Sequence, residues 1–335
     1  MEILLAIPLL VSFFLVVFIM PHWIKKAKKF GFTGKDMNKH EKRSVAEGGG
    51  LVVLVSFLIS VLVYVALRTF YFKAEENVVE IFALTTSILL LAGIGLIDGA
   101  LGWKMGLRRR TRVFLCIFAA IPLMVINAGD SQISVPLISG INLLWIYPFL
   151  IIPLGIVGTS TTFNFLAGYN GLEAGQGVLV ISALSLVAYL TGSSWLALIG
   201  LCMVVALLAF LIFNKFPAKV FPGDVLTYPV GGLIAIMAIL GNMERVALFF
   251  FIPYILEVGL KLRGNLKKES FGKPNKDGSL EMPYDKIYGL EHFAIWTLKK
   301  SGIKSTEKNV VYLIWAMQIV FIAAGFVIFS KAIFF

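Results

Sequence analysis

Long runs of apolar residues constrain this chain more than any other feature of its sequence. A helix that crosses a bilayer needs about 20 mostly apolar residues, and it satisfies its own backbone hydrogen bonds there. Ten runs approach this length, at residues 3–22, 48–70, 79–97, 111–128, 142–163, 176–192, 194–213, 226–241, 244–261 and 309–331. The pattern predicts an all-α fold, a polytopic integral membrane helix bundle of about ten transmembrane helices, with residues 1–335 in a single membrane domain.

The placement of charged residues predicts how this bundle is oriented. Only 15% of the residues are charged, yet the formal net charge is +11. Lysine and arginine gather on one set of alternating loops, mainly the first, second and last of the loops at 23–47, 98–110, 164–175, 214–225 and 262–308. Because cytoplasmic loops carry the excess of these residues, we expect these five loops in the cytoplasm and both termini on the non-cytoplasmic side. The net charge then reflects orientation and contact with membrane lipids, and it requires no nucleic acid.

Polar residues that hydropathy does not explain lie at the cytoplasmic ends of the predicted spans. Lys39 and Glu47 precede the second span, Asp98 ends the third, and Asp224 precedes the eighth. Each also has an ordinary structural interpretation, such as a helix cap at Asp224 or a turn at Asn170. Because all lie on one side of the membrane, the sequence predicts one cytoplasm-facing site, whereas a transporter more often places its key groups near the midplane.

The residue types in this set favour phosphoryl chemistry. Carboxylate and amide oxygens suit Mg²⁺, which also retains water and substrate phosphates as ligands. Lysine and arginine bind phosphate oxygens. The sequence offers no convincing nucleophile triad, and phosphoryl transfer depends mainly on positioning and charge neutralisation. The residues alone therefore predict metal-assisted phosphoryl transfer at the cytoplasmic leaflet.

Five tracts resemble a known enzyme family, in the family's own order. They are KDMNK at 35–39, GLIDGALGWKMGLR at 95–108, NFLAGYNGLEAGQ at 164–176, NKFPAKVFPGDVLTYPVGG at 214–232 and NKDGSLEMPYDK at 275–286. The third tract closely resembles the signature of the polyprenyl-phosphate N-acetylhexosamine-1-phosphate transferases, of the glycosyltransferase 4 type. The amino-acid sequence of this tract is similar to those of the eukaryotic and archaeal dolichyl-phosphate branch. This similarity argues against the bacterial phospho-N-acetylmuramoyl-pentapeptide transferases.

The resemblance implies a reaction and a set of residue roles. The reaction is transfer of HexNAc-1-phosphate, with GlcNAc as the expected sugar, from a UDP-sugar to dolichyl or another polyprenyl phosphate, which releases UMP. This is the first membrane step of lipid-linked oligosaccharide synthesis for N-glycosylation. The expected cofactor is Mg²⁺, with Mn²⁺ as the alternative. The implied metal ligands are Asn164 and Asp224, the implied catalytic residues are Asp98 and Arg108, and the implied substrate-binding residues are Lys39, Glu47, Asn170, Glu173, Arg263 and His292.

The chain departs from the family pattern in two places. Gly99 replaces the second member of an acidic pair, and Gly102 replaces an asparagine near it. The last loop also lacks the family's histidine-rich or Arg-His-Arg signature, so Arg263 and His292 are the candidate substitutes. By spacing alone His292 is structural. These departures argue against mechanisms that need both acidic residues.

Three alternatives stay open at this stage. A lipid-linked sugar flippase or transporter would share the apolar composition, and an inactive homologue would explain Gly99. The third is the bacterial-type transferase. We expect an archaeal plasma membrane, with the endoplasmic reticulum as the alternative. A homodimer is among the partners considered.

Overall fold

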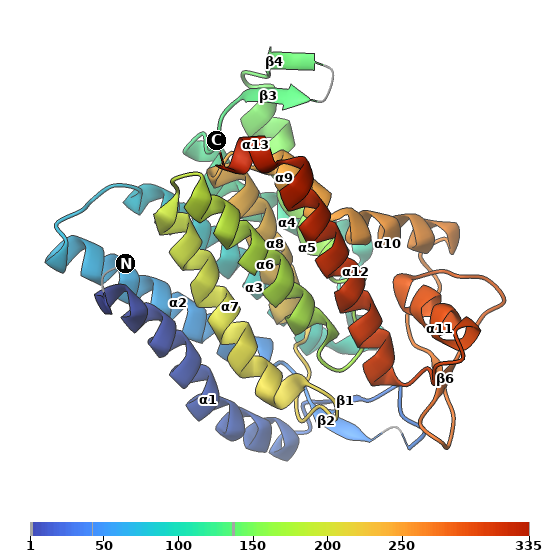
Figure 1. Cartoon of the computed structure of the whole chain (residues 1–335). Coiled ribbons are helices and arrows are strands. Elements are labelled where there is room, and N and C mark those ends of the chain that lie inside the picture. The colour runs from blue at the N-terminus through green and yellow to red at the C-terminus, as the bar shows by residue number, and fades with distance from the viewer. Residues whose placement is uncertain (1–2, 42, 136–137, 335) are drawn as a thin grey trace.

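The computed structural model describes residues 3–41, 43–135 and 138–334 as a predominantly helical bundle (Figure 1). The helices are η1 (Ile3–Leu5), α1 (Ala6–Lys29), α2 (Gly50–Ala66), η2 (Leu67–Tyr71), α3 (Val78–Met105), α4 (Arg109–Val125), η3 (Tyr147–Ile151), α5 (Ile152–Phe163), α6 (Leu172–Leu190), α7 (Ser194–Asn214), α8 (Asp224–Leu240), α9 (Glu244–Phe250), α10 (Ile252–Arg263), α11 (Leu290–Lys300), α12 (Glu307–Ile328) and α13 (Ser330–Phe334).

Short antiparallel sheets occur only in the connections between helices, within the described residues. Each has two strands: β1 (Thr33–Lys35) with β2 (Ser44–Ala46), β3 (Gln132–Val135) with β4 (Ile138–Asn142), and β5 (Lys273–Pro274) with β6 (Leu280–Glu281). The β1–β2 and β5–β6 hairpins lie at the end of the bundle that carries the predicted cytoplasmic loops, and β3–β4 projects from the opposite end (Figure 1).

Helix α8 forms the centre of the bundle. Its residues from Val225 to Ile239 are all buried, because α2, α3, α5 and α6 pack around it. A helix that is apolar on every side is stable only when it is enclosed in this way. Two glycines allow the close packing, since a Cβ atom at Gly231 would overlap the backbone of α5 and one at Gly232 would overlap Leu91 of α3. The packing fixes the first turn of α8, where Asp224 lies.

All ten predicted spans fall on helices, and the membrane character of the chain is confirmed. Among the described residues, six helical segments are long and apolar enough to cross a bilayer, namely α1, α2 with η2, α3, α6, α7 and α12. The segment from η3 to α5 and helix α8 are apolar but shorter. The count of ten spans therefore stays a prediction.

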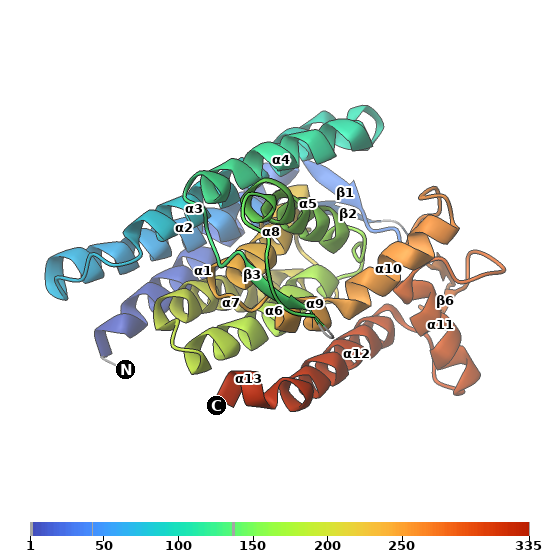
Figure 2. The same ribbon diagram turned by 90° about the horizontal axis from the view of Figure 1, so that it is seen from above.

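The predicted span 244–261 is not one continuous helix. It breaks at Phe251, which ends α9 and precedes α10. Pro253 lies in the first turn of α10, where its missing N–H costs nothing. Beyond the break, α10 leads away from the bundle toward α11, as both views show (Figures 1 and 2). The hydropathy pattern did not predict this change of direction, because the apolar run continues through it.

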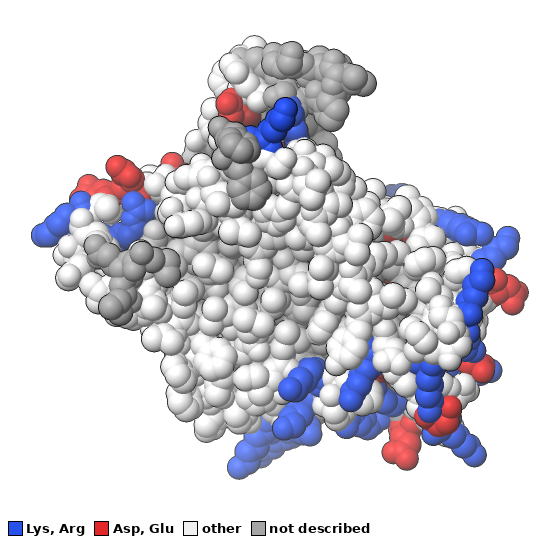
Figure 3. Space-filling model, viewed as in Figure 1, with Lys and Arg blue, Asp and Glu red and all other residues white. Residues whose placement is uncertain are grey.

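The molecular surface separates into apolar and charged zones. In Figure 3, lysine and arginine gather along the rim that holds the end of α1 and the α10–α11 segment, and an uncharged region separates this rim from the charged residues on the opposite side. The start of α1 and the end of α13 lie on the side away from α11 (Figures 1 and 2). Cys116 and Cys202 are buried free thiols.

Candidate active site

Three of the predicted site residues meet where α3 passes the first turn of α8. A Cβ atom at Gly95 would overlap the backbone of Asp224, so only glycine permits this approach. Asp98 lies three residues further along α3, on the same helix face. Its carboxylate is within hydrogen-bonding range of the Asp224 carboxylate, which also contacts the side chain of Asn164. The structure brings Asp98, Asn164 and Asp224 together, and the catalytic and metal-binding roles assigned to them stay predictions.

Arg112 completes this group, and the sequence analysis did not identify it. Its Nε lies 2.8 Å from Asp98 Oδ2, and its Nη1 lies 3.4 Å from the hydroxyl of Tyr228. Asp98 Oδ1 accepts a hydrogen bond from the backbone N–H of Leu107 at 2.8 Å. Arg112 was missed because it falls inside the predicted span 111–128. Its position one helical turn after Arg108 was the available signal.

Arg108 itself occupies the N-cap position of α4 and is exposed. Its backbone carbonyl accepts a hydrogen bond from the N–H of Arg112 at 3.0 Å. The two arginines are therefore consecutive on one helix face, and Arg112 is the one that contacts a carboxylate. The catalytic role of Arg108 stays a prediction.

The oxygen atoms at this site suit a hard divalent cation. Two adjacent carboxylates face one guanidinium, so a cation would offset their mutual repulsion. Asn164 adds an amide oxygen, which accepts a hydrogen bond from Thr227 Oγ1 at 3.1 Å. Within the described residues, no three His, Cys, Asp or Glu side chains gather as a metal cluster. A set of two carboxylates and one amide fits Mg²⁺, which takes its other ligands from water and substrate phosphates.

Gly99 leaves space where the family has its second acidic residue. A Cβ atom there would meet nothing within 4 Å. The carboxylate beside Asp98 is therefore that of Asp224, which comes from a different helix. Glycine at position 99 therefore leaves open space where an acidic side chain was expected, and it does not disturb the contact between Asp98 and Asp224.

A second group of predicted residues is joined by Glu307. One oxygen of this buried carboxylate accepts hydrogen bonds from the backbone N–H and the side-chain amide of Asn170, at 2.7 and 2.6 Å. The other pairs with Lys39, whose ammonium lies 3.9 Å from the centre of the Phe216 ring. Asn170 Oδ1 in turn accepts from the N–H of Ala218 at 2.6 Å. Three loops and the start of α12 thus meet at one buried carboxylate.

Glu47 and Glu173 lie beside two neighbouring turns. Glu47 is partly buried, and this burial raises its pKa. It precedes Gly49 and Gly50, whose N–H groups donate to the carbonyls of Phe221 and Pro222 at 2.9 Å each. Glu173 Oε1 accepts from the N–H of Gly168 at 2.9 Å and holds the loop that carries Asn170. The glycine run in the first loop therefore lies against the turn that precedes Asp224. Substrate-binding roles for these acids stay predictions.

Arg263 and His292 belong to a different part of the molecule, around α10 and α11. Arg263 lines a cavity of about 430 Å³, and none of Asp98, Asn164 and Asp224 lines it. His292 is completely buried, and its ring packs 5.5 Å from that of Tyr284. Burial, together with nearby Lys261, lowers the pKa of His292 to about 4, so it is neutral at pH 7. This environment fits a structural role, and substrate contact by either residue stays a prediction.

Comparison with known proteins agrees with this geometry. The glycosyl transferase family 4 profile matches residues 81–242, which span α3 to α8 and include Asp98, Asn164 and Asp224. A Saccharolobus solfataricus protein named as a UDP-N-acetylglucosamine–dolichyl-phosphate N-acetylglucosaminephosphotransferase is 38% identical over 95% of this chain and 94% of its own length. A Sulfolobus acidocaldarius protein with the same name is 33% identical over 92% and 91%.

The similarity extends to eukaryotes. The Schizosaccharomyces pombe protein of this name is 29% identical over 81% of this chain and 70% of its own length. None of these names describes a flippase. The tract around Asn170 and the full-length similarity to the archaeal proteins lead to one assignment. The chain belongs to the polyprenyl-phosphate N-acetylhexosamine-1-phosphate transferases of glycosyl transferase family 4, on the dolichyl-phosphate side of that family.

Proposed function

We propose that this protein transfers N-acetylglucosamine-1-phosphate from UDP-GlcNAc to dolichyl or another polyprenyl phosphate and releases UMP. The observation that carries the proposal is the pairing of Asp98 with Asp224, beside Asn164 and Arg112, at one end of the helix bundle. Relatives that cover nearly the whole chain bear the name of this activity. The expected place of the reaction is the first membrane step of lipid-linked oligosaccharide synthesis.

Asp224 and Asn164 would hold Mg²⁺, with Asp98 beside them. Mn²⁺ has similar ligand preferences and is the alternative. When bound, the cation would supply charge neutralisation for the diphosphate of the UDP-sugar. The donor set supports this proposal, because among the described residues Arg112 is the cation that pairs with this group of two carboxylates and an amide oxygen.

The reaction needs no general base from the protein. A phosphate monoester is largely ionised at neutral pH, so its oxygen can attack the β-phosphorus directly. The bond from that phosphorus to the oxygen that bridges the two phosphates breaks, and UMP leaves with the electron pair. Arg112 is placed to stabilise the developing negative charge. Asp98 forms an ion pair with Arg112 and accepts a hydrogen bond from the backbone N–H of Leu107, which supports an orienting role for this carboxylate.

We place this site at the cytoplasmic face of about ten membrane spans, with both termini on the other side. The supply of UDP-GlcNAc, a water-soluble nucleotide, agrees with that face. The membrane is expected to be an archaeal plasma membrane, with the endoplasmic reticulum as the alternative. The positive charge of the loops on this side supports the orientation.

An Asp224→Asn variant tests the proposal. Purified protein is mixed with Mg²⁺, labelled UDP-GlcNAc and dolichyl phosphate, and UMP release and lipid-extractable label are measured. We expect kcat to fall by at least about 100-fold, the scale of losing one transition-state contact. A second readout is thermal: Mg²⁺ should raise the melting temperature of the wild type and not of the variant.

Asp277→Asn is the matched control, because Asp277 is an exposed acid paired with Lys304 at 3.3 Å. It should retain full activity. Wild-type rates in Asp224→Asn at saturating Mg²⁺ would contradict the proposed metal site. No turnover by the wild type with any polyprenyl phosphate or UDP-sugar would instead favour an inactive homologue.

A further inference from the structure

Helix α11 presents an aromatic pair to its surroundings. Its inner face is buried through Leu290, Ala294, Ile295 and Leu298. On the outer face, Phe293 and Trp296 are 40% and 43% exposed, with their rings stacked 6.1 Å apart. Lys299 and Lys300 follow in the last turn, and the ammonium of Lys300 lies 4.9 Å from the centre of the Trp296 ring. Aromatic rings beside lysines on one helix face are typical of a membrane interface.

A buried polar contact fixes this face outward. Glu257 Oε2 accepts a hydrogen bond from the N–H of Leu290 at 2.6 Å, at the first residue of α11. Glu257 also lies 3.4 Å from the ammonium of Lys261, within α10. Glu291 and His292, the next residues of α11, are fully buried against this contact. The helix therefore cannot rotate to hide Phe293 and Trp296 without exposing these polar groups.

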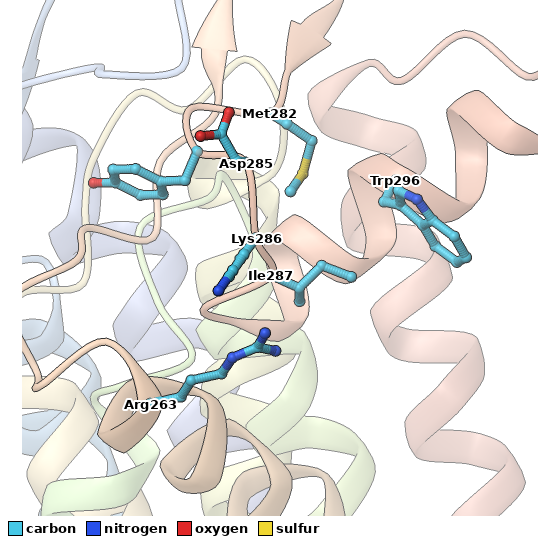
Figure 4. Close-up of a pocket in the computed structure, with 7 residues that line it drawn as sticks. Arg263, Met282, Asp285, Lys286, Ile287 and Trp296 are labelled. Carbon is cyan, nitrogen blue, oxygen red and sulfur yellow. The ribbon is translucent and has the colours of Figure 1, made fainter.

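A cavity that contains two cations opens beside the same tryptophan. Arg263, Lys286, Ile287 and Trp296 are among its lining residues, and its volume is about 430 Å³. Figure 4 shows the charged ends of Arg263 and Lys286 pointing toward each other from two walls of the cavity. In the described part of the chain, neither cation has a carboxylate within 4 Å. Asp285 also lines the cavity, but its carboxylate points away from the charged ends of Arg263 and Lys286 in Figure 4. The space between the two cations therefore favours an anion.

The surroundings of the cavity favour a lipid as the source of that anion. On α10, which ends at the cavity residue Arg263, three apolar side chains are exposed by about half or more; we call Ile255, Leu256 and Leu262 the apolar strip. Lysine and arginine gather along the same rim in Figure 3. An amphipathic anion would place its apolar part on this strip and its charge in the cavity.

We propose that the α10–α11 segment is a binding surface for anionic phospholipid. The lipid phosphate lies between Arg263 and Lys286, and Phe293 and Trp296 insert among the neighbouring glycerol and upper acyl groups. This surface is distinct from the transfer site, since its cavity is lined by none of Asp98, Asn164 and Asp224. It attaches the last loop to the membrane surface whether or not substrate is bound.

Fluorescence quenching of Trp296 tests the proposal. The protein is placed in nanodiscs of phosphatidylcholine and phosphatidylglycerol, with brominated acyl chains on one lipid at a time. The signal of Trp296 is the difference between wild type and Trp296→Phe. At equal mole fractions, we expect brominated phosphatidylglycerol to quench Trp296 about twofold more than brominated phosphatidylcholine, because the cations enrich the anionic lipid locally.

Variants that remove the cavity cations test whether the preference for phosphatidylglycerol arises at the cavity. Arg263→Gln with Lys286→Gln should abolish the difference between the two lipids and leave quenching by phosphatidylcholine. Both side chains are exposed, so folding is little affected, and Lys286→Gln alone should reduce the difference. The matched control is Lys273→Gln with Lys276→Gln, two exposed lysines of the same loop that do not line the cavity.

Two results would overturn the proposal directly. Equal quenching by both lipids would exclude selection of the anionic headgroup, and absence of Trp296 quenching would exclude membrane contact. A third arm distinguishes lipid from substrate. If saturating UDP-GlcNAc or dolichyl phosphate displaced brominated phosphatidylglycerol from Trp296, the cavity would belong to the transfer reaction. No displacement is expected.

Discussion

Glu307 illustrates how a single side chain organises distant parts of the site. One of its oxygens accepts a hydrogen bond from Asn170 while the other pairs with the ammonium of Lys39, and its exposed fraction is 2%. A buried carboxylate is stable only when its charge is paired and its oxygens accept hydrogen bonds. Here both conditions are met by residues that the resemblance implies bind substrate. Glu307 is therefore a positioning residue for Lys39 and Asn170.

A Glu307→Gln variant should weaken nucleotide binding more than catalysis. Glutamine retains an acceptor for Asn170 but loses the closer of two carboxylate charges beside Lys39, the other being Asp36 at 3.8 Å. We expect KM for UDP-GlcNAc to rise about 10-fold, which corresponds to one charged hydrogen bond, while kcat changes less. Initial rates over a range of UDP-GlcNAc concentrations measure both. Glu281→Gln, at an exposed ion pair with Lys299, is the control; an unchanged KM in Glu307→Gln would refute the positioning role.

Residue patterns predicted the carboxylates of the site better than their partners. Asp98 and Asp224 stood out because polar groups beside glycines are unusual at the ends of apolar runs, and Asn164 was implied by the resemblance of its tract to the family signature. Arg112 and Glu307 did not stand out, since a charged residue within one turn of a span end is ordinary. Their importance comes from contacts between helices that are far apart in the sequence. Such contacts are a property of the packed bundle, and local pattern does not encode them.

At the scale of the element, helix positions were more predictable than helix directions. Each predicted span contains a helix, because hydropathy reports burial in lipid or protein core. The break at Phe251 and the outward course of α10 depend on packing, and Pro253 was the one sequence signal for them. Helix α11 was read only as part of a long loop. Its buried face contains Glu291 and His292, so its apolar pattern is interrupted.

The buried His292 gives α11 a specific response to acid. Its pKa is about 4 in the folded protein and near 6.5 when unfolded, so protonation favours unfolding. The stability it contributes is complete above pH 6.5 and is lost as the pH falls toward 4. In His292→Phe this loss is absent, so the melting temperature should fall less between pH 7 and pH 5 than in the wild type.

Neighbouring charged groups do not obscure this comparison. Burial raises the pKa of Glu291, so its protonation opposes the effect of His292, but it does so in both proteins. Lys261 and Tyr284, the other ionisable neighbours, are likewise unchanged in the variant. Fluorescence-detected melting in detergent at the two pH values provides the measurement. Parallel curves for wild type and variant would show that His292 does not control the response.

At the scale of the whole molecule, the charge distribution predicts one orientation in the membrane. Loops at 23–47 and 262–308 carry most of the excess lysine and arginine. In the structure the ends of α1 and the α10–α11 segment form one charged rim, while the start of α1 lies away from it (Figures 1 and 3). The sequence could predict this polarity because loop charge is counted without knowledge of packing.

Cysteine labelling in intact cells tests the orientation. Cys116 and Cys202 are buried, so a membrane-impermeant maleimide should not label the wild type. Cysteine is introduced at Glu76, in the predicted external loop 71–78, and at Lys276, in the predicted cytoplasmic loop 262–308; both positions are exposed. We expect Glu76→Cys to be labelled in intact cells and Lys276→Cys only after permeabilisation. The reverse pattern would invert the topology.

The contact between Asn170 and Glu307 also sets the order in which a newly made chain becomes active. The two residues are 137 positions apart, so the ribosome has delivered the Asn170 loop long before Glu307 is synthesised. Until α12 is made, Lys39 and Asn170 lack Glu307 and retain the longer contacts with Asp36 Oδ2, at 3.8 and 3.4 Å. If the proposed function holds, a half-made chain held at the insertion machinery has membrane helices but an incomplete Lys39–Asn170 group, and we expect no turnover of UDP-GlcNAc before α12 has been made.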